Sequence, residues 1–188
     1  MTEDPYTYPG SSVLRNRLGI TDAALLDLSE RELVLQRVAQ GIPGGRFDLA
    51  HLRDIHRHLF QDVYEWAGGV RTVEIAKDGH QFQFRRYIDT GMADVHRRLA
   101  SAKFLRGLSR AAFAAAAGAI MGDVNYVHPF REGNGRAQLF YLEQLAEQAG
   151  HRLDLSQIDP DRWIAASQAA HGGDYNAMGD EIGRVLTL

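Results

Sequence analysis

Apolar residues recur at helical spacing along most of this chain. Between residues 22 and 40, leucine and valine side chains return to one helical face, and the same periodicity reappears six more times. Polar residues stand where these helices would begin, namely Thr21 or Asp22, Asp48, Ser109 and Asp159. The pattern predicts seven helices, at about residues 22–40, 48–64, 88–104, 110–127, 136–148, 160–169 and 174–186. The predicted fold class is therefore all-α, a helical bundle.

One stretch departs from the helical pattern. Residues 70–76 alternate and are rich in β-branched side chains, and residues 81–84 alternate again after the turn Lys77-Asp78-Gly79. Asp-Gly between two alternating runs is a strong hairpin signal. The sequence thus predicts a small β-hairpin over residues 70–84, with strands at 70–76 and 81–84. Because an isolated two-stranded hairpin is marginally stable, we expect it to lie on the helical body.

Composition narrows the choice of compartment and partner. The 188 residues have a net charge of -3 and 45% hydrophobic content, which predicts a single domain over residues 1–188. There is no cysteine, so disulfides and thiolate chemistry are excluded. The N-terminus is acidic, and the longest apolar run, residues 111–121, is too short to span a membrane. Both features favour a cytoplasmic protein, although export by another route stays open.

Nucleic acid is not an expected partner for a chain of this net charge. The segment from residue 85 to residue 110 contains seven basic residues and only two acidic ones. They form either a solvated helix face or a docking surface for an acidic partner, and no nucleic-acid-binding motif accompanies them.

The chemistry is concentrated in residues 128–136, His-Pro-Phe-Arg-Glu-Gly-Asn-Gly-Arg. His128 can accept a proton near neutral pH, and Glu132 is the kind of hard oxygen ligand that Mg²⁺ takes beside substrate phosphates. Gly133 and Gly135 let anionic oxygens approach a backbone that opens a helix. Arg136, in the first turn, opposes the helix dipole unless an anion binds between them.

These residues supply a base, a metal carboxylate and an anion cradle, but no nucleophile. We therefore expect His128 to activate a hydroxyl that another molecule brings, and a phosphate-containing group to be transferred onto it. The segment is not a P-loop, because GxxxxGK[ST] is absent from the sequence. A zinc site made by His51, His56 and His58 is disfavoured, since their spacing does not share one helical face.

The segment resembles the signature of the Fic family, HxFx[DE]GNGR. The hairpin is similar to the Fic flap, and Tyr6-Thr7-Tyr8-Pro9-Gly10 is similar to the start of compact Fic toxins. The resemblance implies the Fic fold for the whole chain, with the flap at about 70–84 and the signature loop and helix at 128–149. It also implies transfer of AMP from ATP, with Mg²⁺, onto a Ser, Thr or Tyr hydroxyl of a target protein.

The resemblance assigns roles position by position. His128 would be the general base and Glu132 the Mg²⁺ ligand, and the nucleotide would contact Gly133, Asn134, Gly135 and Arg136. Lys77, on the flap, is expected to reach a phosphate. The flap would hold the target by strand addition, through Thr72, Val73, Glu74, Ile75, Gln81 and Phe82.

The sequence departs from the family pattern in two places. Full signatures continue to a second arginine, which would fall at position 139, where this chain has Leu139. We expect Leu139 to face the core. This leaves three readings open: AMP transfer, transfer of phosphate or another nucleotidyl group, and a weakened or silent protein that only binds nucleotide. The inhibitory motif [ST]xxxE[GN] is also absent, so inhibition is expected from a separate antitoxin-like partner.

Overall fold

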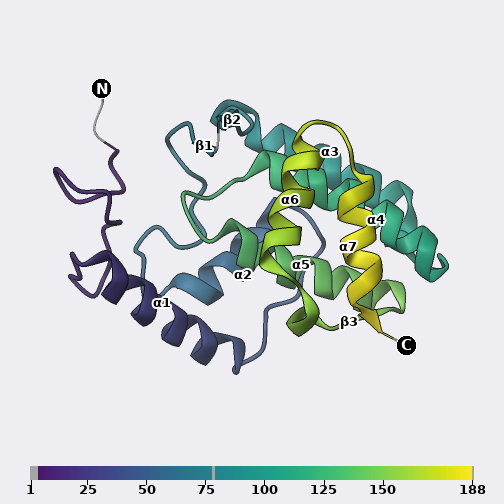
Figure 1. Ribbon diagram of the computed structural model, residues 1–188, viewed down its shortest axis with the longest axis horizontal. Helices are drawn as coiled ribbons and strands as arrows, with labels where there is room; N and C mark the ends of the chain where they lie inside the picture. Colours follow the sequence, from purple (N-terminus) through teal and green to yellow (C-terminus); the bar gives the residue numbers. More distant parts are fainter. Residues whose placement is uncertain (1–3, 78, 188) are drawn as a thin grey trace.

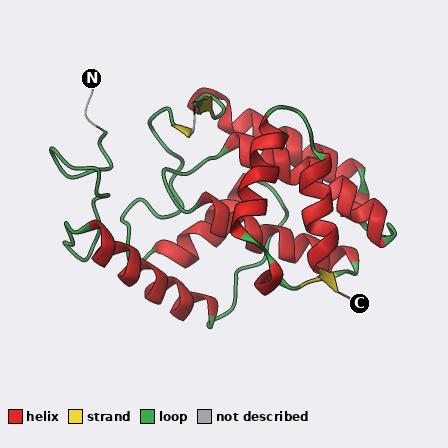
Figure 2. Ribbon diagram, viewed as in Figure 1, coloured by secondary structure: helices red, strands yellow, loops and turns green. Residues whose placement is uncertain are grey.

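The computed structural model describes residues 4–77 and 79–187, and 58% of the chain is helical. Figures 1 and 2 show a body of packed helices with short strands at its edge. The helices are α1 (Ala23–Val38), α2 (Leu49–Phe60), α3 (Ile88–Ser101), α4 (Arg110–Val127), α5 (Asn134–Ala149), α6 (Pro160–His171) and α7 (Asn176–Val185). The predicted all-α class is confirmed.

The helix α4 is the central element. It packs against α3, α5, α6 and α7, while α2 lies against α5 and α1 covers α2 from outside. The closest approach joins α4 to α7, where a Cβ on Gly118 would lie 2.5 Å from the backbone nitrogen of Gly179. Glycine at this crossing lets the two backbones touch, so that α7 packs closely along α4.

The predicted helix starts at residues 22, 48 and 109 are confirmed by their caps. Asp22 accepts from the N–H of Leu25, Asp48 from that of His51, and Ser109 from that of Ala112. Each side chain satisfies one backbone N–H that the first helical turn leaves without a partner.

Several predicted helix ends are wrong by a few residues. α2 stops at Phe60 and not at residue 64, and α5 begins at Asn134, two residues before its predicted start. α3 stops at Ser101 because residues 103–105 take positive φ angles of 51°, 54° and 62°. These left-handed residues form a tight turn that the apolar spacing does not reveal.

The predicted hairpin exists, but its predicted strands are too long. Its paired strands are β1 (Ala76–Lys77) and β2 (His80–Gln81), with Ala76 opposite Gln81 and Lys77 opposite His80. Asp78, the predicted turn residue, lies outside the described residues. Residues 70–75 are not a strand, because the Arg71 guanidinium takes the carbonyls of Val73 and Gln83 that a ladder would use.

A second short pair closes the far end of the body. β3 (Arg152–Leu153) runs antiparallel to β4 (Leu186–Thr187) and fastens the end of α7 beside α5. Within the part of the chain that the structure describes, every helix falls short of the length and apolarity that crossing a membrane requires.

Candidate active site

His128 stands immediately after α4 in a left-handed conformation. Its φ of 46° is uncommon for a residue with a side chain and turns the imidazole away from the helix axis. The Nδ1 atom lies 3.0 Å from the carbonyl oxygen of Asn125, which can only accept, so Nδ1 carries the proton. The Nε2 atom is then the one with a free lone pair.

The pKa of His128 is lowered from its ordinary value to about 4, mainly by burial. The positive charges of Arg71, Lys77 and His171 lower it further, and the hydrogen bond to Asn125 partly opposes them. The ring is therefore neutral at pH 7 and its base form is fully available. A low pKa makes the imidazole a weak proton acceptor at rest, and the hydrogen bond to Asn125 fixes its orientation.

The loop after His128 is fixed by a buried histidine of α2. His56 accepts from the N–H of Gly68 at Nδ1 and donates from Nε2 to the carbonyl of Glu132 at 2.9 Å. Its ring stacks on Phe130 with centroids 3.9 Å apart, and burial lowers the pKa of His56 to about 4. Phe130 is fully buried, as a core anchor should be. The sequence analysis considered His56 only as a zinc ligand, and its place on the apolar face of α2 did not indicate this role in fixing the loop.

The turn into α5 is built by Asn134 and Gly133. The Asn134 amide accepts from the N–H of Phe130 and donates to its carbonyl, so this side chain closes the loop on itself. Gly133 has a φ of 77°, and a Cβ there would lie 2.5 Å from Phe60. A Cβ on Gly135 would meet open space. The first N–H groups of α5 have no partner within the helix, and they surround this open position.

Arg136 is held from a distant helix. Its guanidinium lies 2.5 Å from a carboxylate oxygen of Glu30 on α1, 3.7 Å from Glu132, and over the ring of Phe60 at 4.6 Å. Glu30 is buried, and its second oxygen accepts from the hydroxyl of Tyr64. Burial raises the pKa of Tyr64, and the bond to Glu30 adds to the rise. Glu30 was missed in the sequence, where it reads as one more charged residue on an amphipathic helix.

Glu132 presents the carboxylate that could hold a metal ion. Its side chain is 49% exposed, and one oxygen accepts from the N–H of Gly133 at 2.8 Å. Mg²⁺ usually takes one or two protein carboxylates and completes its shell with water and phosphate oxygens. One exposed carboxylate beside a helix N-terminus fits that donor set, and a cage of three acidic or histidine ligands is absent from the described residues.

A cavity of about 240 Å³ joins the signature loop, the flap and α6. The structure brings the predicted site residues His128, Glu132, Asn134 and Gly135 to this cavity, together with Lys77 and Phe82 of the flap. Two other predicted nucleotide contacts, Gly133 and Arg136, are not among the described residues that line this cavity. α6 supplies the opposite wall, which the sequence analysis missed, with Trp163, Ile164, Ser167, Gln168 and His171.

The residues of the α6 wall have a regular spacing in the sequence. Trp163, Ser167 and His171 are spaced four residues apart and so share one helical face. That spacing indicates a helix face with both apolar and polar side chains. Only the fold shows that this face lines the cavity.

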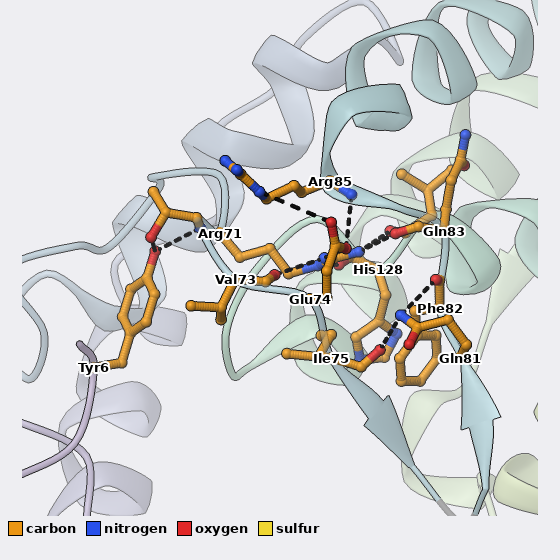
Figure 3. Close-up of polar contacts among 12 residues, drawn as sticks. Tyr6, Arg71, Val73, Glu74, Ile75, Gln81, Phe82, Gln83, Arg85 and His128 are labelled. Atoms are coloured by element: carbon orange, nitrogen blue, oxygen red, sulfur yellow. Dashed lines mark hydrogen bonds and ion pairs between the residues drawn. The ribbon is translucent and has the colours of Figure 1, made fainter. Parts of the chain in front are cut away.

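The flap contacts the catalytic candidate directly. Phe82 is buried and stacks on the ring of His128 with centroids 3.7 Å apart, as Figure 3 shows. Other predicted flap contacts already have partners: Glu74 meets Arg71 and Arg85, and Thr72 donates to the hydroxyl of Tyr6. Ile75 is tied to the second arm, because its carbonyl accepts from the Gln81 side chain and the Phe82 N–H.

Leu139 lies one turn beyond Arg136 on α5. Its side chain is half-buried and packs against the core, as expected. The position where the signature would continue to a second arginine therefore carries no charge, and its apolar side chain cannot bind a phosphate.

Comparison with known sequences gives consistent matches over nearly the whole chain. The sequence model of the Fic/DOC family matches residues 46–146. The protein y4lH of Sinorhizobium fredii, named a probable protein adenylyltransferase, is 41% identical over 98% of this chain and 96% of its own length. The protein adenylyltransferase VbhT of Bartonella schoenbuchensis is 39% identical over 99% of this chain, which spans 40% of VbhT.

Solved structures agree with these matches. The N-terminal Fic domain of a VirB-translocated effector of Bartonella quintana, solved with bound ADP, superposes with a TM-score of 0.88 at 29% identity, covering 97% of this chain and 94% of that one. The BepC protein of Bartonella tribocorum, solved with bound AMPPNP, gives a TM-score of 0.88 at 28% identity, covering 97% and 96%.

Proposed function

The chain belongs to the Fic/DOC family, and from this premise we propose that it transfers AMP from ATP to a Ser, Thr or Tyr hydroxyl of a target protein. The observation that carries the proposal is the placement of His128, with a free Nε2 lone pair, on the same cavity as Glu132 and the N-terminus of α5. The relatives named as protein adenylyltransferases support it.

In this mechanism His128 removes the proton from the attacking hydroxyl. The hydroxyl oxygen forms a bond to the α-phosphorus, the bond to the β-phosphate oxygen breaks, and pyrophosphate leaves. The proton goes to Nε2, since Nδ1–H is engaged by Asn125. The N–H groups at the start of α5, from Asn134 to Arg136, would donate hydrogen bonds to the phosphate oxygens and stabilise the negative charge that develops on them.

Glu132 is the proposed ligand for Mg²⁺. When bound there, the ion would neutralise charge on the phosphates. Arg136 contributes less free charge than its sequence position suggests, because Glu30 already pairs with it. The carboxylates of Glu30 and Glu132 would therefore make the cradle unattractive to ATP without a divalent cation, which supports a requirement for the metal.

The flap is the proposed docking site for the target. Lys77 lines the cavity from β1 and is the proposed flap contact to a phosphate. Strand addition along the first flap arm, Thr72 to Ile75, where Thr72 and Glu74 are exposed, would present a hydroxyl to His128 without demanding a particular target sequence. Gln81 is exposed on the second arm, whereas the buried Phe82 would shape the floor under the target segment.

We further propose that activity is restrained by a separate antitoxin-like protein and exerted in a cytoplasm, either that of the producing cell or that of a recipient. Absence of the self-inhibitory motif from the sequence supports the first part. The structurally similar VirB-translocated effector proteins of Bartonella support a translocated route.

A second candidate function is transfer of phosphate or of another nucleotidyl group, and Leu139 favours it. Without a guanidinium at that position, the terminal phosphate of ATP lacks one signature contact. Mass spectrometry of the modified target separates the two functions. An added AMP group supports the proposal, an added phosphate supports the second candidate, and restoration of modification only in Leu139→Arg identifies a weakened enzyme.

A further inference from the structure

Four consecutive carbonyl groups around His128, those of residues 126–129, accept hydrogen bonds from Arg71 or Gln83. A helix leaves its last carbonyls without intrahelical partners, and here those of α4 run into the catalytic turn. The carbonyl of Tyr126 accepts from the N–H of Gln83 at 3.0 Å. The carbonyls of Val127 and His128 accept from the Arg71 guanidinium at 3.4 and 2.8 Å, and the carbonyl of Pro129 accepts from the Arg71 backbone N–H at 2.8 Å.

Arg71 binds both arms of the flap with the same side chain. Its guanidinium donates to the carbonyl of Val73 at 2.8 Å, to that of Gln83 at 2.5 Å, and to the Glu74 carboxylate at 3.3 Å. Figure 3 shows these contacts converging between the flap and His128. A guanidinium has five N–H groups, and the two arms and the catalytic turn use all five. The side chain is fully buried.

We propose that Arg71 is a positioning residue that joins the catalytic turn and the base of the flap into one rigid unit. It holds the carbonyl of His128 at a fixed place relative to the flap arms. The left-handed backbone of His128, which orients the imidazole, is thereby fixed as well. The inference rests on the proposed function, because its consequence is that a target segment added to the flap lies in register with Nε2 of His128.

Lysine could not replace Arg71 in this position. An ammonium group has three donors at one point, whereas the bound carbonyls surround a planar fork on different sides. Arg71→Lys keeps the charge and most of the volume but leaves part of this set unpaired. Arg85→Gln is the matched control. It removes an exposed cation that also meets Glu74, at 3.8 Å, and touches none of the carbonyls around His128.

Two measurements test the proposal without relying on turnover. Long-range ¹H–¹⁵N NMR reports which nitrogen of His128 carries the proton, and hydrogen exchange reports opening of the Gln83 amide. In Arg71→Lys we expect a mixture of His128 tautomers and at least tenfold faster exchange at Gln83, with the amides of α5 unchanged. Arg85→Gln should match wild type in both. Unchanged tautomer and unchanged exchange in Arg71→Lys would overturn the proposal.

Nucleotide binding and turnover separate this proposal from the proposed function. Arg71 does not contact the loop from Phe130 to Arg136, so the Kd for MgATP should stay within about threefold of wild type while kcat falls at least tenfold. If wild type itself transfers no AMP but the NMR and exchange changes appear, the proposed function fails and the role of Arg71 stands. Equal loss of MgATP affinity and turnover would indicate a merely structural residue.

If Arg71→Lys does not fold, native-state hydrogen exchange of the wild-type chain answers the question. The amides of Arg71 and Gln83 bind the catalytic turn at Pro129 and Tyr126. We expect both to exchange through one opening event, with the same free energy and the same denaturant dependence. Separate openings would contradict a single unit.

Discussion

The chemistry of single residues in this site depends on partners far away in the chain. Arg136 in the signature is fixed by Glu30, and the loop carbonyl of Glu132 by His56. Neither partner could be recognised from the sequence, because a charged residue on an amphipathic helix and a histidine on an apolar face are both common. By contrast, the proposed role of His128 as the base and the tight turn at Gly133 follow from residue type and local spacing alone.

The first prediction concerns Glu30→Gln. Removing the charge of Glu30 leaves Arg136 without its nearest anion. The ion pair is replaced by a buried neutral amide. We expect a loss of about 1–3 kcal/mol in the free energy of unfolding, measured by urea denaturation. Glu32→Gln, on the exposed side of the same helix, is the control and should change stability by less than about 0.5 kcal/mol. Equal losses in the two variants would show that the pair with Arg136 has no special weight.

The second prediction concerns the pH dependence of transfer. Because burial lowers the pKa of His128 to about 4, the base form persists as pH falls. kcat/KM should stay nearly constant from pH 7 to pH 5.5 and fall only near pH 4, measured from initial rates at constant ionic strength. A histidine at its ordinary pKa of 6.5 would lose most of its base form by pH 5.5. A midpoint near 6.5 would therefore contradict this environment for His128.

At the scale of elements, helices were predictable and the flap was predictable only in part. Helix starts follow from local capping chemistry, which the residues at 22, 48 and 109 carry on their own. Alternation at residues 70–76 predicted a strand, but only its end, at Ala76–Lys77, is paired in the structure. It could not reveal that the Arg71 guanidinium takes the carbonyls of Val73 and Gln83, because that side chain is held in place by the catalytic turn, more than 50 residues away in the chain. The α6 wall was missed for the same reason.

The third prediction concerns the contact between the flap and the catalytic turn. Phe82→Ala removes the ring that covers His128 and lets water reach the imidazole. Since burial is the main cause of the lowered pKa, we expect the pKa of His128 to rise toward its ordinary value, measured by NMR titration. Phe84→Ala is the control, because Phe84 is 50% exposed two residues further along. Equal titration curves in both variants would show that the flap does not set the environment of His128.

At the scale of the whole molecule, the N-terminal segment ties the site to the outside of the helical body. Asp4 accepts from Arg131 of the signature loop at 2.8 Å, and the hydroxyl of Tyr6 accepts from the N–H of Thr72 at 3.0 Å. The first described residues thus brace both the loop and the flap. The Tyr-rich start indicated an ordered segment, but its contacts could only be read from the fold.

The fourth prediction concerns acid stability. His56 and His128 both have their pKa lowered to about 4, so the unfolded chain binds protons at higher pH than the folded one. Their contribution to stability is present above pH 6.5 and is lost as pH falls toward 4. We expect the free energy of unfolding to drop by on the order of 3 kcal/mol between pH 7 and pH 5, measured by urea denaturation. A constant value across this range would contradict two buried neutral histidines.

The central claim, that this Fic-family chain transfers AMP with His128 as its base, is tested most directly with α-labelled ATP. The purified chain is incubated with labelled ATP, Mg²⁺ and a bacterial lysate, in parallel with His128→Ala. We predict a labelled protein band with wild type that disappears in His128→Ala, although both bind MgATP. A band that persists in His128→Ala, or label that transfers only from γ-labelled ATP, would contradict the account.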